Sequence, residues 1–324
     1  MIIRHKSPII FIWLNSKLPS YARYFINLAK LNNPDRQIIL GCNYKTPSIP
    51  GVSIYKFQID KKHLINSMNL SVTDDFFFAT SARFFYLYYL ANKLKLTHFF
   101  HAEVDNAIFD LKNIEKMLDR SRNGLFYTKD SQSRAIASLL YCNNIHCLKM
   151  LLDILQDEEL EIDNDMEALS VYTTLYPQSF LALPTESFSV SKNSWEIIPP
   201  TEINGIFDAA ALGQYLLGAN TQYYPDKNIY NLYKNENLMI NLKKVNFFVA
   251  RNQLFVENLA KDPLPIFNLH VHSKSVAKFQ DLMKRVDFLE SVNSGERTII
   301  RKKANPIALF AIRLKLKLKS IFFK

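Results

Sequence analysis

Residues 97–106 read Thr-His-Phe-Phe-His-Ala-Glu-Val-Asp-Asn, an apolar run that ends in two acidic residues. The segment 97–102 has the pattern of a short strand buried in a sheet. Glu103 and Asp105 follow at a spacing of two, so both carboxylates can turn toward one divalent cation beyond the strand. Carboxylate oxygens suit Mg²⁺ or Mn²⁺, which share their remaining positions with water and substrate phosphates. The stretch therefore predicts a buried strand with a metal site at its end.

A simpler alternative exists for these two acids. They could begin the following helix, whose positive N-terminal dipole favours carboxylates. An acid-x-Asp triplet is common by chance, so the position of Glu103 and Asp105 directly after a buried strand is what favours the metal site.

The chain before residue 97 alternates short apolar runs with helical patterns. Residues 8–14 and 37–41 are predicted strands, with a helix over 20–31 between them. A long aromatic-rich helix is predicted over 74–96, and a further helix over 133–155. This alternation indicates an α/β fold with an open sheet, in which ligands gather beyond the carboxyl ends of the strands.

Length and composition favour one large domain. The chain has 324 residues, is 48% hydrophobic, and contains no Gly/Ser-rich or Pro-rich linker. We expect one domain over residues 1–290 and a basic tail over 291–324. Three cysteines suit a reducing compartment, and the N-terminus resembles no signal peptide. No stretch reaches the length of a spanning helix, so a cytoplasmic, soluble or peripheral protein is expected.

A second polar motif lies near the C-terminus. Residues 268–274 read Asn-Leu-His-Val-His-Ser-Lys. In extended chain His270, His272 and Lys274 project to the same face. One imidazole could bind the metal, and the lysine could meet a phosphate. The alternative is a strand edge with solvated polar residues.

Three segments together resemble bacterial surface-polysaccharide glycosyltransferases of the GT-A fold, over roughly residues 8–275. They are residues 99–106, residues 205–218 (Gly-Ile-Phe-Asp-Ala-Ala-Ala-Leu-Gly-Gln-Tyr-Leu-Leu-Gly) and residues 268–274. The resemblance implies an open mixed, mostly parallel sheet with helices on both faces. It also implies transfer of a sugar from a nucleotide-sugar donor, most simply a UDP-sugar, to a capsule or lipooligosaccharide acceptor.

The resemblance also assigns roles to individual residues. Glu103-x-Asp105 looks like a variant of the Asp-x-Asp motif that holds the metal in this fold. The glutamate leaves open whether residue 103 binds the metal directly, binds it through water, or contacts the ribose. A late histidine, His270 or His272, would complete the metal site.

On the donor side, Trp13 and Asn15 would lie near the base and ribose. Arg83 would contact the diphosphate, unless it is an ordinary charge on a helix surface.

On the acceptor side, Asp208 is the candidate general base for the acceptor hydroxyl. Its alternative is to cap a helix over 209–217. Gln214 is a weaker candidate for a sugar contact. Asp163 and Asp165 lie in a charged run that is typical of a solvated face.

The C-terminal residues 306–324 read Pro-Ile-Ala-Leu-Phe-Ala-Ile-Arg-Leu-Lys-Leu-Lys-Leu-Lys-Ser-Ile-Phe-Phe-Lys. They form an imperfectly amphipathic, basic helical pattern. We expect this extension to bind an anionic membrane surface, since each basic residue near the headgroups contributes about 1 kcal/mol. That would hold the enzyme on the inner face of the cell membrane, beside a lipid-linked acceptor. The alternative is a helix that docks on the domain or on a second subunit.

Two other functions fit parts of the sequence. The same acidic and histidine clusters could serve a metal-dependent phosphoester hydrolase. The net charge of +10 would also suit a nucleic-acid-binding protein. No nucleic-acid motif supports that reading and the positive charge is concentrated in the tail, so no nucleic-acid partner is expected.

Overall fold

The computed structural model describes residues 6–14, 16–58, 68, 75–111, 114–129, 134–185, 196–218, 247–250, 252–257 and 263–284. The predicted contact at Asn15 and the predicted tail over 291–324 therefore lie outside the described residues.

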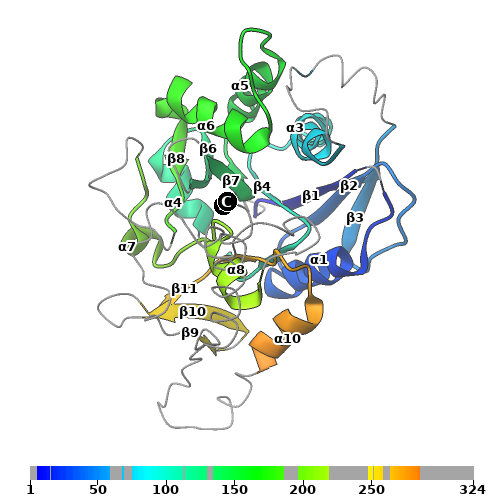
Figure 1. Ribbon diagram of the computed structural model, residues 1–324, viewed down its shortest axis with the longest axis vertical. Coiled ribbons are helices and arrows are strands. Elements are labelled where there is room, and N and C mark those ends of the chain that lie inside the picture. The colour runs from blue at the N-terminus through cyan, green and yellow to red at the C-terminus, as the bar shows by residue number, and fades with distance from the viewer. Residues whose placement is uncertain are drawn as a thin grey trace, which may run out of the picture.

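A seven-stranded sheet forms the centre of the molecule (Figure 1). Its strands are β1 (Ile9–Trp13), β2 (Ile38–Cys42), β3 (Val52–Lys56), β4 (Phe99–Ala102), β6 (Leu125–Lys129), β7 (Ala135–Cys142) and β8 (Phe180–Ala182). Their spatial order is β3-β2-β1-β4-β7-β6-β8, and only the two pairings that involve β7 are antiparallel. The predicted fold class, an open mixed and mostly parallel sheet, is confirmed.

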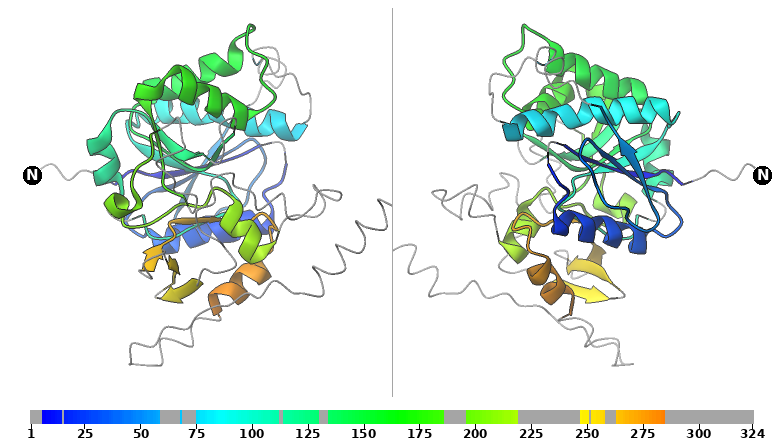
Figure 2. Two further views of the ribbon diagram at one scale, coloured as in Figure 1. Left: turned by 60° about the vertical axis from the view of Figure 1, so that its left-hand side comes forward. Right: turned by 90° about the vertical axis from the view of Figure 1, so that its right-hand side faces the viewer.

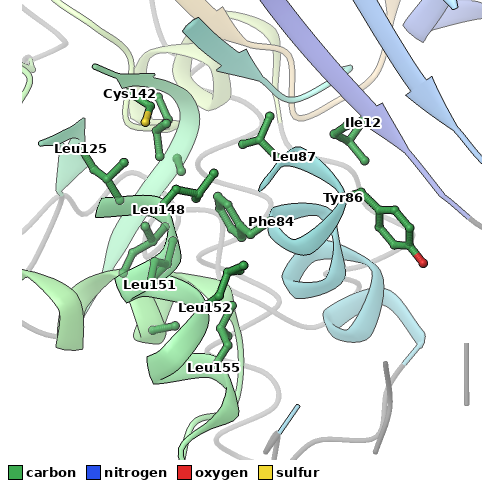
Figure 3. Close-up of a cluster of buried hydrophobic side chains, with 14 of the residues drawn as sticks. Ile12, Phe84, Tyr86, Leu87, Leu125, Cys142, Leu148, Leu151, Leu152 and Leu155 are labelled. Carbon is green, nitrogen blue, oxygen red and sulfur yellow. The ribbon is translucent and has the colours of Figure 1, made fainter. Parts of the chain in front are cut away.

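Helices cover both faces of this sheet (Figure 2). One face packs against α3 (Asp75–Lys93), α5 (Ile145–Gln156) and α6 (Asp165–Leu175), and the other against α1 (Ser20–Asn32) and α4 (Ile114–Ser121). Alternate residues of β1 enter the two cores, Ile10 and Ile12 on the α3 face and Ile9 and Phe11 on the α1 face. Figure 3 shows the cluster on the α3 face, where Phe84 and Leu87 meet leucines of α5.

The helix predicted over 133–155 is wrong in its first half. Residues 135–142 form β7, which pairs with both β4 and β6 in the middle of the sheet, and the helix begins only at Ile145. A continuous apolar run does not distinguish a fully buried strand from a buried helix. The strand ends at Cys142, and two residues later the Asn144 side chain caps α5 by accepting from the His146 backbone N–H.

Several smaller elements lie outside the central sheet. These are η1 (Pro177–Ser179), α7 (Pro200–Ile203), α8 (Ala211–Leu217), α10 (Val276–Lys284), the sheet of β9 (Phe247–Ala250), β10 (Gln253–Glu257) and β11 (Pro263–Pro265), and the pair of β5 (Asn106–Ile108) with β12 (Asn268–His270). A third apolar core joins α1, α8, α10 and β9–β10. Among the described helices, none is long and apolar enough to cross a membrane.

Candidate metal centre

The acidic segment and the histidine segment meet as two short antiparallel strands. β4 ends at Ala102, and a turn closed by the Asn106 N–H on the Glu103 carbonyl (3.1 Å) leads into β5. β12 pairs with β5 so that His270 lies opposite Asn106. One further backbone bond runs from the Val271 N–H to the Asp105 carbonyl, at 2.8 Å. This pairing places the two segments at the carboxyl end of β4.

Three potential metal ligands come together there. His270 Nε2 lies 3.3 Å from Glu103 Oε2 and 3.4 Å from Asp105 Oδ1. One ligand atom from each residue lies within 4.8 Å of the others, and within the described ranges no other such group occurs. Adjacent ligands of an octahedral ion with bonds of about 2.1 Å would be about 3 Å apart. Two carboxylates and one imidazole therefore fit Mn²⁺ or Mg²⁺ in both spacing and chemistry, and leave positions for water and substrate.

Opposite charges hold these side chains together. Burial alone would lower the pKa of His270, but the carboxylates of Asp105 and Glu103 outweigh burial and raise it to about 9. Burial works in the other direction on Asp105, and the positive His270 overcomes it, so the pKa of Asp105 lies well below its usual range. The protonated imidazole thus supplies the two carboxylates with the positive charge that a bound cation would otherwise bring.

Lys274 and His272 lie beside this cluster. The Lys274 Nζ is 3.9 Å from Asp105 Oδ2 and 5.7 Å from the centroid of the Tyr21 ring, and its backbone has a φ of 53°. The His272 ring centroid is 4.9 Å from that of His270, and burial and the positive His270 lower the pKa of His272 to about 4. Of the two histidines, the structure brings His270 against both carboxylates.

Asp208 has the contacts of a helix cap. The residue is fully buried, and its Oδ1 accepts from the Leu212 N–H at 3.0 Å. Its Oδ2 accepts from the N–H groups of Gly213 and His270, each at 2.9 Å. Burial raises the pKa of Asp208 to about 6, although the three N–H donors oppose that rise. The capping alternative is therefore realised in the structure, while a role as general base stays a prediction.

Arg83 is buried between two carboxylates. Its guanidinium pairs with Glu103 on one side and, at 2.7 Å, with Asp165 at the start of α6 on the other. The alternative of a helix-surface charge is wrong, because only 7% of Arg83 is exposed. The expectation that Asp165 lies on a solvated face is also wrong, because its side chain is 6% exposed. The sequence analysis missed this pair of contacts. Asn164 caps α6 by accepting from the backbone N–H groups of Met166 and Glu167.

Trp13 and Gln214 lie near this edge with less defined contacts. The parallel pairing of Phe11 with Ala102 puts Trp13, at the end of β1, on the same edge of the sheet as Glu103. Its indole N–H donates to the Ser16 carbonyl at 3.0 Å. Gln214 is buried on α8, and its side-chain oxygen accepts no hydrogen bond from the described residues.

Comparison with known proteins shows distant likenesses only. No model of a known protein family matches the sequence, and no curated protein matches it. Among solved structures, an active-site mutant of LgtC is 11% identical with a TM-score of 0.44, over 89% of this chain and 97% of that one. The galactosyltransferase LgtC with donor and acceptor sugar analogues is 14% identical with a TM-score of 0.36, over 56% and 74%. A cytidylyltransferase from Leptospira borgpetersenii is 11% identical with a TM-score of 0.36, over 70% and 92%. At these values the likenesses assign no activity to this chain.

Proposed function

We propose that this protein is a metal-dependent glycosyltransferase that uses a nucleotide-sugar donor, with a UDP-sugar as the first choice, and a surface glycan as acceptor. The observation that carries the proposal is the convergence of Glu103, Asp105 and His270 at the carboxyl end of β4, with Lys274 beside them. When bound, a divalent cation would neutralise the charge that develops on the departing nucleoside diphosphate.

The residues of the site divide this work. Asp105 and His270, whose ligand atoms lie 3.4 Å apart, would hold the ion together with Oε2 of Glu103. The other oxygen of Glu103 is engaged by Arg83, so we assign Arg83 to holding Glu103 in place of the predicted diphosphate contact. The Lys274 ammonium, 3.9 Å from Asp105 Oδ2, would meet a diphosphate oxygen, since a lysine binds phosphate as a point charge.

The remaining assignments concern Trp13, Asn15 and Asp208. Trp13, with the neighbouring Asn15, would lie against the base and ribose. We assign Asp208 to the placement of His270, in place of the predicted role as general base, because its carboxylate accepts the His270 N–H and the residue has no exposed surface from which to reach an acceptor hydroxyl.

A ligand panel tests the proposal. The full chain is heated with Mn²⁺ and each of several nucleoside diphosphates, and a nucleotide that fits the site should raise the melting temperature only when the metal is present. The corresponding nucleotide-sugar is then incubated with glycan acceptors. Transfer to the acceptor supports the proposal, whereas cleavage that needs no acceptor would make the protein a phosphoester hydrolase.

Binding of Mn²⁺ should release a proton from His270. The pKa of His270 is raised to about 9, so at pH 7 the imidazole is protonated and must lose its proton to become a ligand. Competition by the proton weakens as pH rises, so Mn²⁺ affinity should increase by roughly tenfold per pH unit from pH 6 until it levels off near pH 9. Calorimetric titrations in two buffers of different ionisation enthalpy measure the proton directly. Binding without proton release would remove His270 from the ligand set.

The C-terminal residues 301–324 are proposed to bind the anionic inner surface of the cell membrane, which would place the enzyme in the cytoplasm beside a lipid-linked acceptor. Removal of these residues should abolish sedimentation with anionic vesicles, because their basic side chains supply the attraction. A vesicle preparation of neutral lipid serves as the control. Equal binding of both forms to anionic vesicles would exclude the anchor.

A further inference from the structure

Four buried polar residues from distant parts of the chain form one hydrogen-bonded group behind the metal centre. Asn106 lies on β5, Ser138 on β7, Asp208 before α8 and Asn268 on β12. None of the four has exposed surface. We call these four residues the polar cluster. The sequence did not predict contacts among these four residues.

Asn268 is the centre of the polar cluster. Its Nδ2 donates to Asn106 Oδ1 at 3.2 Å, and contacts Ser138 Oγ and the Asp208 carbonyl, each at 3.4 Å. Its Oδ1 accepts the Asp208 N–H at 3.2 Å. One amide side chain therefore reaches three other segments of the chain, the farthest of them 162 residues away.

The other members connect this amide to the ends of the central strands. Asn106 Nδ2 donates to the Ser138 carbonyl at 2.6 Å, and that carbonyl also accepts the Glu103 N–H at 3.0 Å. Ser138 Oγ donates to the Asp208 carbonyl at 3.3 Å. The backbone of Glu103 is thereby hydrogen-bonded to Ser138, and the backbone of Asp208 to Ser138 and Asn268.

His270 depends on the polar cluster for its position. It lies two residues after Asn268 on a strand of only three residues, and its own N–H is held by Asp208 Oδ2. So short a ladder specifies its register weakly, and a slip by one residue would turn the histidine to the opposite face. Any slip would also leave the buried amide groups of Asn268 and Asn106 without partners, which is costly in a buried site.

We propose that Asn268 is a positioning residue for the metal centre: through Asn106, Ser138 and Asp208 it holds β12 in the one register that presents His270 to Glu103 and Asp105. The inference rests on the proposed function, since it takes the metal centre as the working site. Its side chain forms hydrogen bonds with Asn106, Ser138 and Asp208, and none with the side chains of the three ligands, all of which are described residues, so it would act on them through the backbone and the polar cluster.

The test compares Asn268→Ala with Asn33→Ala, using Mn²⁺ affinity as the readout alongside urea unfolding. Asn33 is a matched control, because it is also buried and its amide makes three hydrogen bonds, to the Ala29 and Phe109 carbonyls and from the Leu111 N–H. Both variants should lose stability. Only Asn268→Ala should weaken Mn²⁺ binding, by about 10- to 100-fold, the range for the loss of a group that orients a ligand.

Two further variants keep the test decisive. Ser138→Ala removes one hydroxyl from the polar cluster and should weaken Mn²⁺ binding less, which provides a milder substitution if Asn268→Ala does not fold. Asn106→Ala combined with Asn268→Ala should cost less affinity than the two single changes added together, because the residues share one bond.

The outcomes separate the two proposals. Native Mn²⁺ affinity in folded Asn268→Ala or, where that variant does not fold, in Ser138→Ala would overturn the positioning role, as would an equal loss of affinity in Asn33→Ala. If the unmodified protein binds no Mn²⁺, the proposed function fails at its first step and this inference fails with it.

Discussion

Replacement of Asp105 by alanine is expected to abolish Mn²⁺-dependent turnover of the nucleotide-sugar donor while the fold remains intact. Asp105 is the carboxylate that faces both His270 and Lys274, at 3.4 Å and 3.9 Å. Loss of a group that only orients a ligand costs about 10- to 100-fold in metal affinity or activity, so loss of a ligand itself should exceed 100-fold. Turnover is measured by release of the nucleoside diphosphate at saturating Mn²⁺.

The fold should tolerate this change because His270 can lose its proton once its partner is gone. Asp105→Asn, which keeps the shape of the side chain and removes its charge, should lose activity to a similar degree. Asp110→Ala is the control, since Asp110 is an exposed carboxylate that follows β5 and lies outside the group of three ligands. Full activity in Asp105→Ala, or in the unmodified protein with excess chelator, would refute metal dependence.

Replacement of Gly213 by alanine should disrupt both the packing of α8 and the metal centre. A Cβ atom at residue 213 would lie 1.8 Å from the backbone oxygen of His270 and 2.8 Å from its carbonyl carbon. Those are backbone atoms of β12, so no side chain can rotate away to make room. Overpacking of this kind costs typically 1–3 kcal/mol and at times more. Because the displaced strand carries His270, Mn²⁺ affinity should fall along with the free energy of unfolding.

The variant Gly218→Ala is the control that separates a loss of stability from a loss of Mn²⁺ affinity. Gly218 caps the end of α8 with a φ of 81° and a ψ of 164°, a conformation open almost only to glycine, so an alanine there would be strained by about 1–3 kcal/mol. Its added Cβ would come no closer to a described side chain than 3.7 Å, from Lys278 Nζ. This variant should therefore lose stability and keep its Mn²⁺ affinity. The same pattern in Gly213→Ala would show that the close contact of α8 with β12 does not shape the site.

Local sequence patterns predicted most of the first half of the fold. The apolar run at 8–14 and the helix over 20–31 correspond to β1 and α1, and the run at 97–102 contains β4. In each case the pattern extends over neighbouring residues, and burial on one or both faces determines it. The strand β7 was not predicted, because its strand conformation depends on pairing with β4 and β6, which the local sequence does not show. An isolated apolar run of that composition also suits a helix.

The candidate site, like the fold, was predicted only in part from the sequence. The sequence alone suggested the ligand types. It showed two acids directly after a strand, and a late histidine with a lysine four residues further on. Residue spacing could not show that Arg83 is shared by Glu103 and Asp165, or that Asp208 holds the N–H of His270. Those contacts join α3, α6 and β12 with the connections that carry Glu103 and Asp208.

The sequence by itself determined the residue types of the site, the strand that presents two of them, and the alternation that builds an α/β sheet, since all three are written in adjacent residues. Only the tertiary structure decided which histidine meets the carboxylates, which of the acids are buried, and how β12 is held against β5. The physical reason is that these features depend on hydrogen bonds and charge pairs between groups far apart in the chain, for example 82 residues for Arg83 and Asp165 and 162 residues for Asn106 and Asn268. Such interactions become strong only when folding has buried both partners together.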